Sequence, residues 1–254
     1  MYKFYYVIAA SDDYKIAKKN KVKRVLYSYF YIKQKPRLFE KILEEPWQII
    51  IDSGVYSFNN KAPSEEEIKK YCDDYIEFVK DFSSKNNIEN FFELDFDLMG
   101  YDYKTFVKPY QDKLLNITDK IILVNQIGRT EEDLQEMLQH KNNIIAIPCA
   151  NNKVRSKFDY DRLINIIHKA NKKVHLLGCS KLNYLKMADQ SDSSTWIMSS
   201  VFGRKIKIVD EITTIKSNEK KIEIADNNCK EFKKLEKLVE KHKKFKQITI
   251  YDLN

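Results

Sequence analysis

Two aspartates stand where a chain of alternating strands and helices would place catalytic groups. Asp52 follows the apolar run 47–51 and opens a D-S-G-V-Y segment, and Asp192 lies in an S-D-S-S-T-W segment some 140 positions later. Barrel enzymes keep their chemistry at the carboxyl ends of strands. Two carboxylates there could act as a nucleophile and a proton-transfer partner. Because Asp-Ser-Gly also opens loops, a local role as turn former is the alternative.

Other polar residues follow further apolar runs. Asp95, Gln126 and Gly178 each come directly after such a run, and Asp97 competes with Asp95 for the same role. All would face one mouth of a parallel barrel. Three carboxylates and a carboxamide, with no histidine or cysteine metal ligands, favour acid/base or covalent chemistry over metal hydrolysis. We therefore expect no metal and no organic cofactor. We interpret His175, inside an apolar run, as a core histidine, and a second proton shuttle is the alternative.

The elements that must position these residues are strands and helices in alternation. Helical patterns are clearest at residues 36–45, 64–84, 130–139 and 159–171, two of them with capping-box starts. Eight strands alternating with helices predict a compact α/β fold, the (β/α)8 barrel. A doubly wound sheet is the alternative, but no Gly-rich nucleotide fingerprint is present. The expected strands are residues 2–9, 47–51, 90–94, 120–124, 144–147, 173–177 and 205–209, with a weaker one at 190–192.

Length and composition favour a single globular domain. A chain of 254 residues with 43% hydrophobic residues can bury a sizeable core. We expect a barrel over about residues 2–210 and an extension over about 211–254 with a basic helix at 229–246. No apolar run approaches the ~20 residues of a membrane span. The four cysteines form no C-x-x-C pair, so we expect reduced thiols in a soluble, cytoplasmic protein.

Charge is unevenly distributed along the chain. The net charge is +8, and residues 1–40 carry ten basic against three acidic side chains, whereas residues 41–200 carry 21 against 25. Basic ends around an acidic centre suit a polynucleotide partner held at the periphery. A solvated lysine-rich surface is the alternative. The candidate phosphate contacts are Lys18, Lys19, Lys21, Arg24 and Arg204.

Taken in order, these segments resemble the motifs of the guanine transglycosylases. These barrel enzymes, among them the queuine and archaeosine tRNA-ribosyltransferases, exchange a guanine base in nucleic acid for a 7-deazaguanine. The family's D-S-G-[GA]-[YF], I-V-Q-G and L-M-G elements correspond to residues 52–56, 124–128 and 176–179. Its next aspartate, with a basic residue downstream, corresponds to Asp192 and Arg204. The resemblance covers about residues 2–210, and only these short islands are specific.

The resemblance implies a role for each matching residue. Asp192 would attack the sugar C1′ as guanine leaves and form a covalent intermediate, and Asp52 would act as general acid/base. A carboxylate beside a glycosidic carbon also stabilises the positive charge that develops there, and the base must leave its stack to be reached. Asp95 and Gln126 would hydrogen-bond the base edge, and Tyr56 and Leu177 would cover its faces. The implied base pocket consists of Ser53, Gly54, Tyr56, Asp95, Gln126, Leu177 and Gly178.

The chain departs from the tRNA enzymes in two places. Their zinc-binding cysteines and histidine are missing, and their base-binding glycine pair is replaced by Pro148-Cys149. The shorter pattern at residues 52–57, 175–178 and 191–196 is closer to the zinc-free phage and bacterial DNA-modifying branch. This favours DNA as the polynucleotide, with tRNA possible, and the host cytoplasm if a phage encodes the protein. A protein partner could replace the zinc module, so we expect a monomer or a hetero-complex.

Two other functions are compatible with the same residues. An N-glycosidase would use the same pocket with water as the acceptor. A non-catalytic nucleic-acid-binding barrel would bind nucleic acid through the basic N-terminal and C-terminal segments of the chain, and the residues at its mouth would no longer catalyse a reaction.

Overall fold

The structure is a computed structural model that describes residues 1–58, 63–209 and 211–251, with side chains described to residue 243. The strands are β1 (Lys3–Ile8), β2 (Arg24–Ser28), β3 (Gln48–Asp52), β4 (Ile88–Phe92), β5 (Ile121–Val124), β6 (Ile144–Pro148), β7 (Lys173–Leu177), β8 (Gln190–Ser193), β9 (Arg204–Ile208) and β10 (Ile212–Lys216). The helices are α1 (Ser11–Lys19), α2 (Tyr29–Gln34), α3 (Pro36–Glu44), α4 (Glu65–Phe82), α5 (Lys108–Ile117), α6 (Glu131–Gln139), α7 (Asn152–Arg155), α8 (Tyr160–Lys169), α9 (Leu182–Leu185), α10 (Thr195–Val201) and α11 (Lys221–Tyr251). Single turns lie at η1 (Val55–Phe58), η2 (Phe96–Met99) and η3 (Tyr103–Val107).

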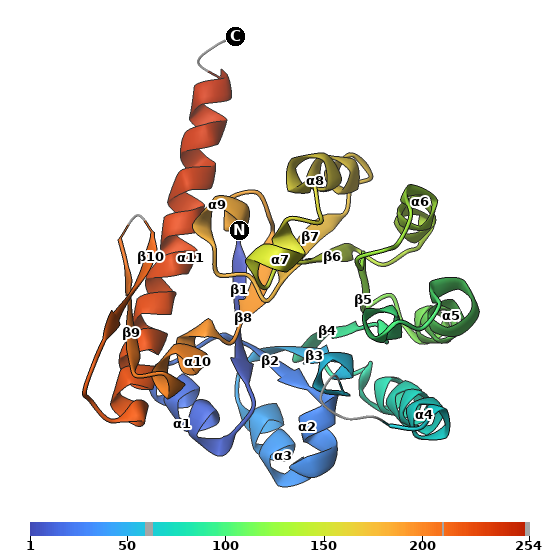
Figure 1. Ribbon diagram of the computed structural model, residues 1–254, viewed down its shortest axis with the longest axis horizontal. Helices are drawn as coiled ribbons and strands as arrows, with labels where there is room; N and C mark the ends of the chain where they lie inside the picture. The colour runs from blue at the N-terminus through green and yellow to red at the C-terminus, as the bar shows by residue number, and fades with distance from the viewer. Residues whose placement is uncertain (59–62, 210, 252–254) are drawn as a thin grey trace.

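Eight parallel strands form a closed barrel in the order β1 to β8, with β8 pairing back to β1 (Figure 1). Helices α3, α4, α5, α6 and α8 lie around the outside of these strands (Figure 1). The predicted (β/α)8 barrel is confirmed. The expected capping boxes at Ser64 and Thr130 are also present, each side chain accepting from the backbone N–H three residues on.

Two strand assignments from the sequence were wrong. β2 was missed, because its five residues are joined to a basic segment on one side and lead directly into α2 on the other. The run 205–209 was expected in the barrel, but it forms β9, which pairs antiparallel with β10 outside the barrel. In β9 buried Ile206 and Ile208 alternate with more exposed lysines. That alternation is typical of an antiparallel strand with one buried face, whereas parallel barrel strands are buried on both faces.

The barrel interior is filled by alternate side chains of the strands. Tyr5, Leu26, Ile50, Phe92 and Ile122 belong to one buried cluster inside the barrel, and the neighbouring residues of each strand pack outward against the helices. Successive side chains point to opposite faces of a strand. The inward register therefore continues from these apolar residues to the polar residues at the carboxyl ends.

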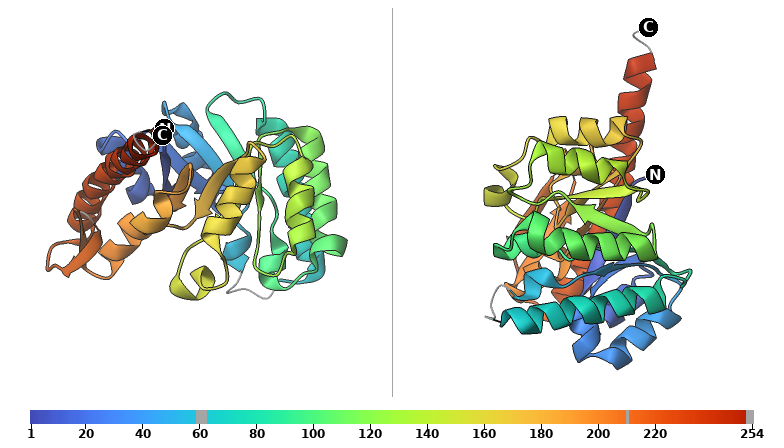
Figure 2. Two further views of the ribbon diagram at one scale, coloured as in Figure 1. Left: turned by 90° about the horizontal axis from the view of Figure 1, so that it is seen from above. Right: turned by 90° about the vertical axis from the view of Figure 1, so that its right-hand side faces the viewer.

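Helix α11 covers the outside of the barrel at β1. Phe232 packs on Phe4 with ring centroids 5.3 Å apart, and buried Asn228 accepts a hydrogen bond from the Ile206 N–H of β9 at 2.7 Å. The same side chain donates to the carbonyls of Trp196 and Arg204, both at 3.1 Å. Figure 2 shows the C-terminal part of α11 extending beyond the barrel. No helix in the described residues is long and apolar enough to cross a membrane.

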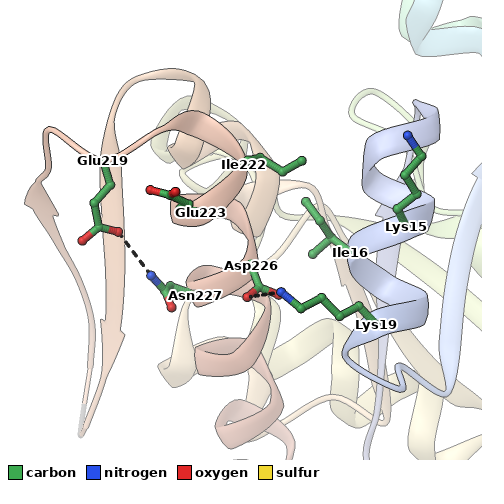
Figure 3. A pocket seen from close by; sticks show the side chains of 8 residues that line it. All are labelled: Lys15, Ile16, Lys19, Glu219, Ile222, Glu223, Asp226 and Asn227. Atoms are coloured by element: carbon green, nitrogen blue, oxygen red, sulfur yellow. Dashed lines mark hydrogen bonds and ion pairs between the residues drawn. The ribbon is translucent and has the colours of Figure 1, made fainter.

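Helix α11 also contacts α1. Lys19 of α1 pairs with Asp226 of α11 at 3.0 Å, and Asp226 also accepts from the Asn20 side chain at 2.7 Å. Between the two helices lies a pocket of about 510 Å3 in which the lysines of α1 stand on one side and acidic side chains of α11 and the segment before it stand on the other (Figure 3). This pocket lies on the outside of the barrel, and none of the predicted catalytic residues lines it.

We expect Asn228→Ala to lower the free energy of unfolding by about 2–4 kcal/mol, because one N–H and two carbonyls would lose their shared partner in a buried site. Urea denaturation of the full chain measures the change. The matched control is the adjacent Asn227→Ala, since Asn227 is half-buried and makes one 3.3 Å bond to Glu219. Equal losses in the two variants would contradict this role for Asn228.

Candidate active site

The carboxyl ends of β3, β7 and β8 and the segments after β4 and β5 bring together five of the predicted site residues. Gln126 donates to Asp95 at 2.9 Å, and the Gly178 N–H donates to Asp192 at 3.1 Å. Burial is the main cause that raises the pKa of Asp52 and of Asp95. The charge of Asp192 raises the pKa of Asp52 further, and the charge of Asp52 raises that of Asp95. The carboxylates of the mouth therefore lie close enough to raise one another's pKa values by electrostatic repulsion.

Asp192 is held by two donors through one of its oxygens. His175 Nε2 lies 2.9 Å from Asp192 Oδ1, which also accepts from the Gly178 N–H. The Gln190 amide nitrogen lies 3.1 Å from His175 Nδ1. Since an amide nitrogen only donates, Nδ1 is the acceptor and the ring proton sits on Nε2, facing Asp192. Within the described residues, the second oxygen of Asp192, Oδ2, accepts no hydrogen bond.

His175 is fixed by its surroundings as well as by its hydrogen bonds. The ring is fully buried inside the barrel and lies edge-on to Phe92, with centroids 5.1 Å apart. The expectation of a buried, satisfied histidine holds in its geometry, because both ring nitrogens have partners. The side chain also orients Asp192, so it acts as a positioning residue for that carboxylate.

Asp52 closes a tight turn and faces the mouth at the same time. Its Oδ2 accepts from the Gly54 N–H at 3.1 Å, the local turn that Asp-Ser-Gly favours. Gly54 has φ +85°, and a Cβ there would lie 2.7 Å from the Tyr71 hydroxyl and 2.9 Å from the Phe30 backbone nitrogen. Only glycine fits this position. Buried Ser53 contributes its carbonyl, which accepts from Tyr71 at 2.6 Å.

Burial raises the pKa of Asp52 to about 6. The Gly54 N–H and the neighbouring Ser28 hydroxyl lower it, and the charge of Asp192 raises it. Ser28 stands opposite Asp52 in the β2–β3 register, but the geometry of its hydroxyl falls short of a hydrogen bond. A carboxyl group with a pKa near 6 can both donate and accept a proton near neutral pH.

Asp95 and Asp97 have different partners. Asp97 is engaged by Arg129 through bonds of 2.7 and 3.2 Å, whereas the Asp95 carboxylate bonds, among the described residues, to Gln126 alone. Burial raises the pKa of Asp95 to about 6, the Gln126 bond lowers it, and Asp97 raises it. Asp95, and not Asp97, therefore has a carboxylate oxygen available to a ligand.

A buried ion-pair network that the sequence did not reveal supports this side of the mouth. Arg129 also donates to Glu93 at 2.8 Å, and the guanidinium lies 4.1 Å from the ring centroid of Tyr103. Burial raises the pKa of Glu93 to about 7, although Arg129 and the Val124 N–H lower it. One guanidinium thus serves two carboxylates. The only sequence signal was the alternating acids Glu93, Asp95 and Asp97, because a buried partner 32 residues later has no local signature.

The other predicted pocket residues lie at the mouth in different environments. Leu177 ends β7 and packs on the interior cluster. Gly178, with φ +67°, places its N–H against Asp192. Tyr56 lies on η1 and is 74% exposed. Leu177 therefore lines the inner wall, whereas Tyr56 extends into solvent beside the mouth.

The predicted phosphate contacts on α1 are not brought to this mouth. Helix α1 runs back from the carboxyl end of β1, so Lys18 and Lys19 lie at its far end. Lys18 pairs with Glu45, and Lys19 pairs with Asp226. Lys21 follows in the turn that leads to β2, with φ +53°. These cations lie toward the amino-terminal end of the barrel.

The remaining two predicted cations are also outside the mouth. Arg24 is the first residue of β2 and pairs with Glu236 of α11 at 2.7 Å. Arg204 begins β9 in the outer hairpin, with its guanidinium 5.9 Å from the ring centroid of Phe202. The mouth and the predicted cationic residues therefore belong to different parts of the surface.

No group of three His, Cys, Asp or Glu side chains in the described ranges is arranged to hold a metal ion. The chain matches no protein-family model and no curated protein sequence.

We expect Asp52→Asn to stabilise the protein at about pH 8, because the folded state holds the Asp52 pKa near 6 and therefore favours its protonated form. The contribution of Asp52 to the folding stability of wild type is fully present below the unfolded pKa of about 4 and is lost as pH rises through the folded pKa of about 6. The neutral amide of the variant does not ionise, so the variant does not lose this stability at high pH. The gain in unfolding free energy should be about 1 kcal/mol larger at about pH 8 than at about pH 5. Urea denaturation at both pH values measures it. Exposed Asp81→Asn on α4 is the control, and the same pH dependence in both variants would disprove the assignment.

Proposed function

We propose that this protein is a base-exchanging pentosyltransferase acting on a polynucleotide, with DNA favoured and tRNA possible. The observation that carries the proposal is the pairing of two differently held aspartates. Asp192 is fixed by two donors on one oxygen and has the other oxygen free, while Asp52 has a pKa near 6 in the same mouth. Carboxyl groups whose environments differ in this way can divide the roles of nucleophile and acid/base.

In the first step, Asp192 Oδ2 attacks C1′ of the target nucleotide. The bond from C1′ to the guanine nitrogen breaks, and its electron pair leaves with the base. Protonated Asp52 donates a proton to the departing guanine, and an aspartyl–sugar ester remains. The carboxylate stabilises the positive charge that develops at C1′. His175 and Gly178 hold Oδ1, so the attacking oxygen keeps its direction.

In the second step, a 7-deazaguanine takes the place of guanine. The proton on its reacting ring nitrogen passes to ionised Asp52, and the nitrogen attacks C1′. The ester bond to Asp192 breaks, and its electron pair returns to the carboxylate. Asp52 is again protonated and Asp192 is again free, so the cycle closes without any other reactant.

The base edge would be read by Asp95 and Gln126. Asp95 can accept from the base through the oxygen that Gln126 leaves free, which suits the N–H donors of a guanine-type base. Leu177 would cover one face of the base and exposed Tyr56 the other. The resemblance of residues 52–56, 124–128 and 176–179 to the guanine transglycosylases implies the same roles.

We expect wild-type protein to incorporate labelled guanine or 7-deazaguanine into DNA or tRNA, tested separately, and Asp192→Ala to reduce incorporation by at least about a thousandfold. Exposed Asp161→Asn on α8 is the control and should keep full activity. Release of guanine without incorporation would identify the N-glycosidase instead. Binding without any turnover would indicate the non-catalytic barrel, and an unaffected Asp192→Ala would refute the assigned nucleophile.

We expect His175→Leu to lower kcat by about tenfold to a hundredfold, because a hydrogen bond to a charged carboxylate is lost. KM for the polynucleotide should stay unchanged, since His175 is buried and lies away from the surface that a polymer meets. His175→Gln keeps a donor and should recover part of kcat. Steady-state kinetics separate these effects. A rise in KM alone, or equal losses in both variants, would argue against a positioning role.

A further inference from the structure

A groove of about 940 Å3 lies at the amino-terminal end of the barrel, between β1, the start of β2 and helix α11. Its inner side is formed by Tyr2, Phe4 and Tyr6 of the first strand region, all of them buried. The catalytic mouth lies at the other end of the same strands, since Asp52 and Asp192 stand at or near strand carboxyl ends. The groove is therefore separate from the site described above.

The two walls of the groove are basic. One comes from the segment that joins α1 to β2 and the other from one face of α11, so residues from the two ends of the chain meet here. Two acidic residues, Glu236 and Glu240, also line it. The basic residues are Lys21, Lys23 and Arg24 on the first wall and Lys230, Lys233, Lys234, Lys237 and Lys241 on the second.

The lysines of α11 follow helical spacing. They stand at relative positions 0, 3, 4, 7 and 11 from Lys230, so they share one face of the helix. The opposite face carries Phe232, Leu235 and Val239, which are buried against the core. Like charges three and four residues apart repel one another on a helix. A bound polyanion would relieve that repulsion along the whole face.

The two acids of the groove already have partners. Glu236 pairs with Arg24 at 2.7 Å and accepts from the Phe4 N–H at 3.0 Å. Glu240 accepts from the Tyr2 N–H. Both acids thus attach α11 to the barrel.

Three lysines of the groove have ammonium groups without a hydrogen-bond or ion-pair partner in the described part of the chain. They are Lys21 and Lys23 on one wall and Lys237 on the other, all exposed. Lys230 and Lys234, in contrast, pair with acids on their own helix. The uncompensated charges face one groove from two sides, which is the arrangement that a chain of phosphates would neutralise.

We propose that this groove binds the sugar-phosphate backbone of a polynucleotide. The identity of that polynucleotide as the substrate rests on the proposed function. Lysines contact phosphates as point charges without reading the base sequence. Because the groove and the mouth lie at opposite ends of the barrel, one polynucleotide reaches both only if it is long enough to pass around the protein. The groove holds a stretch of substrate distant from the reacting base.

The test is the salt dependence of binding by the full chain, measured by fluorescence anisotropy with a labelled DNA duplex of about 60 base pairs and with a tRNA transcript. The triple variant Lys21→Gln/Lys23→Gln/Lys237→Gln removes the three uncompensated cations. For at least one polymer, we expect the slope of log affinity against log salt to become shallower by about two to three, and affinity to fall at least about tenfold at low salt.

The matched control is Lys85→Gln/Lys141→Gln/Lys169→Gln, which removes the same charge from exposed lysines that precede β4, β6 and β7 at the same end of the barrel. Equal slopes for the two triple variants, or no binding of either polymer by wild type, would overturn the proposal. The assay needs no turnover. If the groove variant loses affinity but wild type exchanges no base, the proposed function fails alone; if exchange occurs and slopes are equal, the groove fails alone.

Discussion

Closure of the barrel by β8 is the constraint on which the site depends. All four residues of β8 are polar, yet all are buried, because the strand must pair with both β7 and β1. Buried polar groups require partners. Ser191 bonds to the Tyr2 hydroxyl, Gln190 bonds to His175, and His175 bonds to Asp192. The bonds of Gln190 and His175, which help to make this polar strand tolerable inside the barrel, thus also orient the candidate nucleophile.

The mouth contains more negative charge than the fold can compensate. Arg129 is the one cation in the buried network at the ends of β4 and β5, and it serves both Glu93 and Asp97. In the part of the chain that the structure describes, neither Asp95 nor Asp52 has an ion-pair partner, and burial raises the pKa of each. Such a site is less stable than an apolar one of the same shape. The proton-exchanging chemistry proposed here uses the same unfavourable burial.

The charge asymmetry of the sequence has a spatial explanation. The basic residues near the N-terminus and those of α11 are far apart along the chain, but they meet at the amino-terminal end of the barrel. The acidic middle of the chain supplies the mouth at the other end. The basic groove and the carboxylates of the mouth thus lie at opposite ends of the strands.

The sequence by itself determined the features that arise locally. Apolar runs and capping boxes predicted most strands and helices, and Asp-Ser-Gly indicated a turn at Asp52 as the alternative to a catalytic role, because each pattern depends on neighbouring residues. Only the tertiary structure decided which strands close the barrel. It placed β2 inside and β9 outside, since a short strand is selected by the partners available to it. It also decided the contacts of Asp192 and Arg129, because they join residues from different strands. The cations of α1 lie far from the mouth for a similar reason, since a helix that connects parallel strands must run back along the barrel.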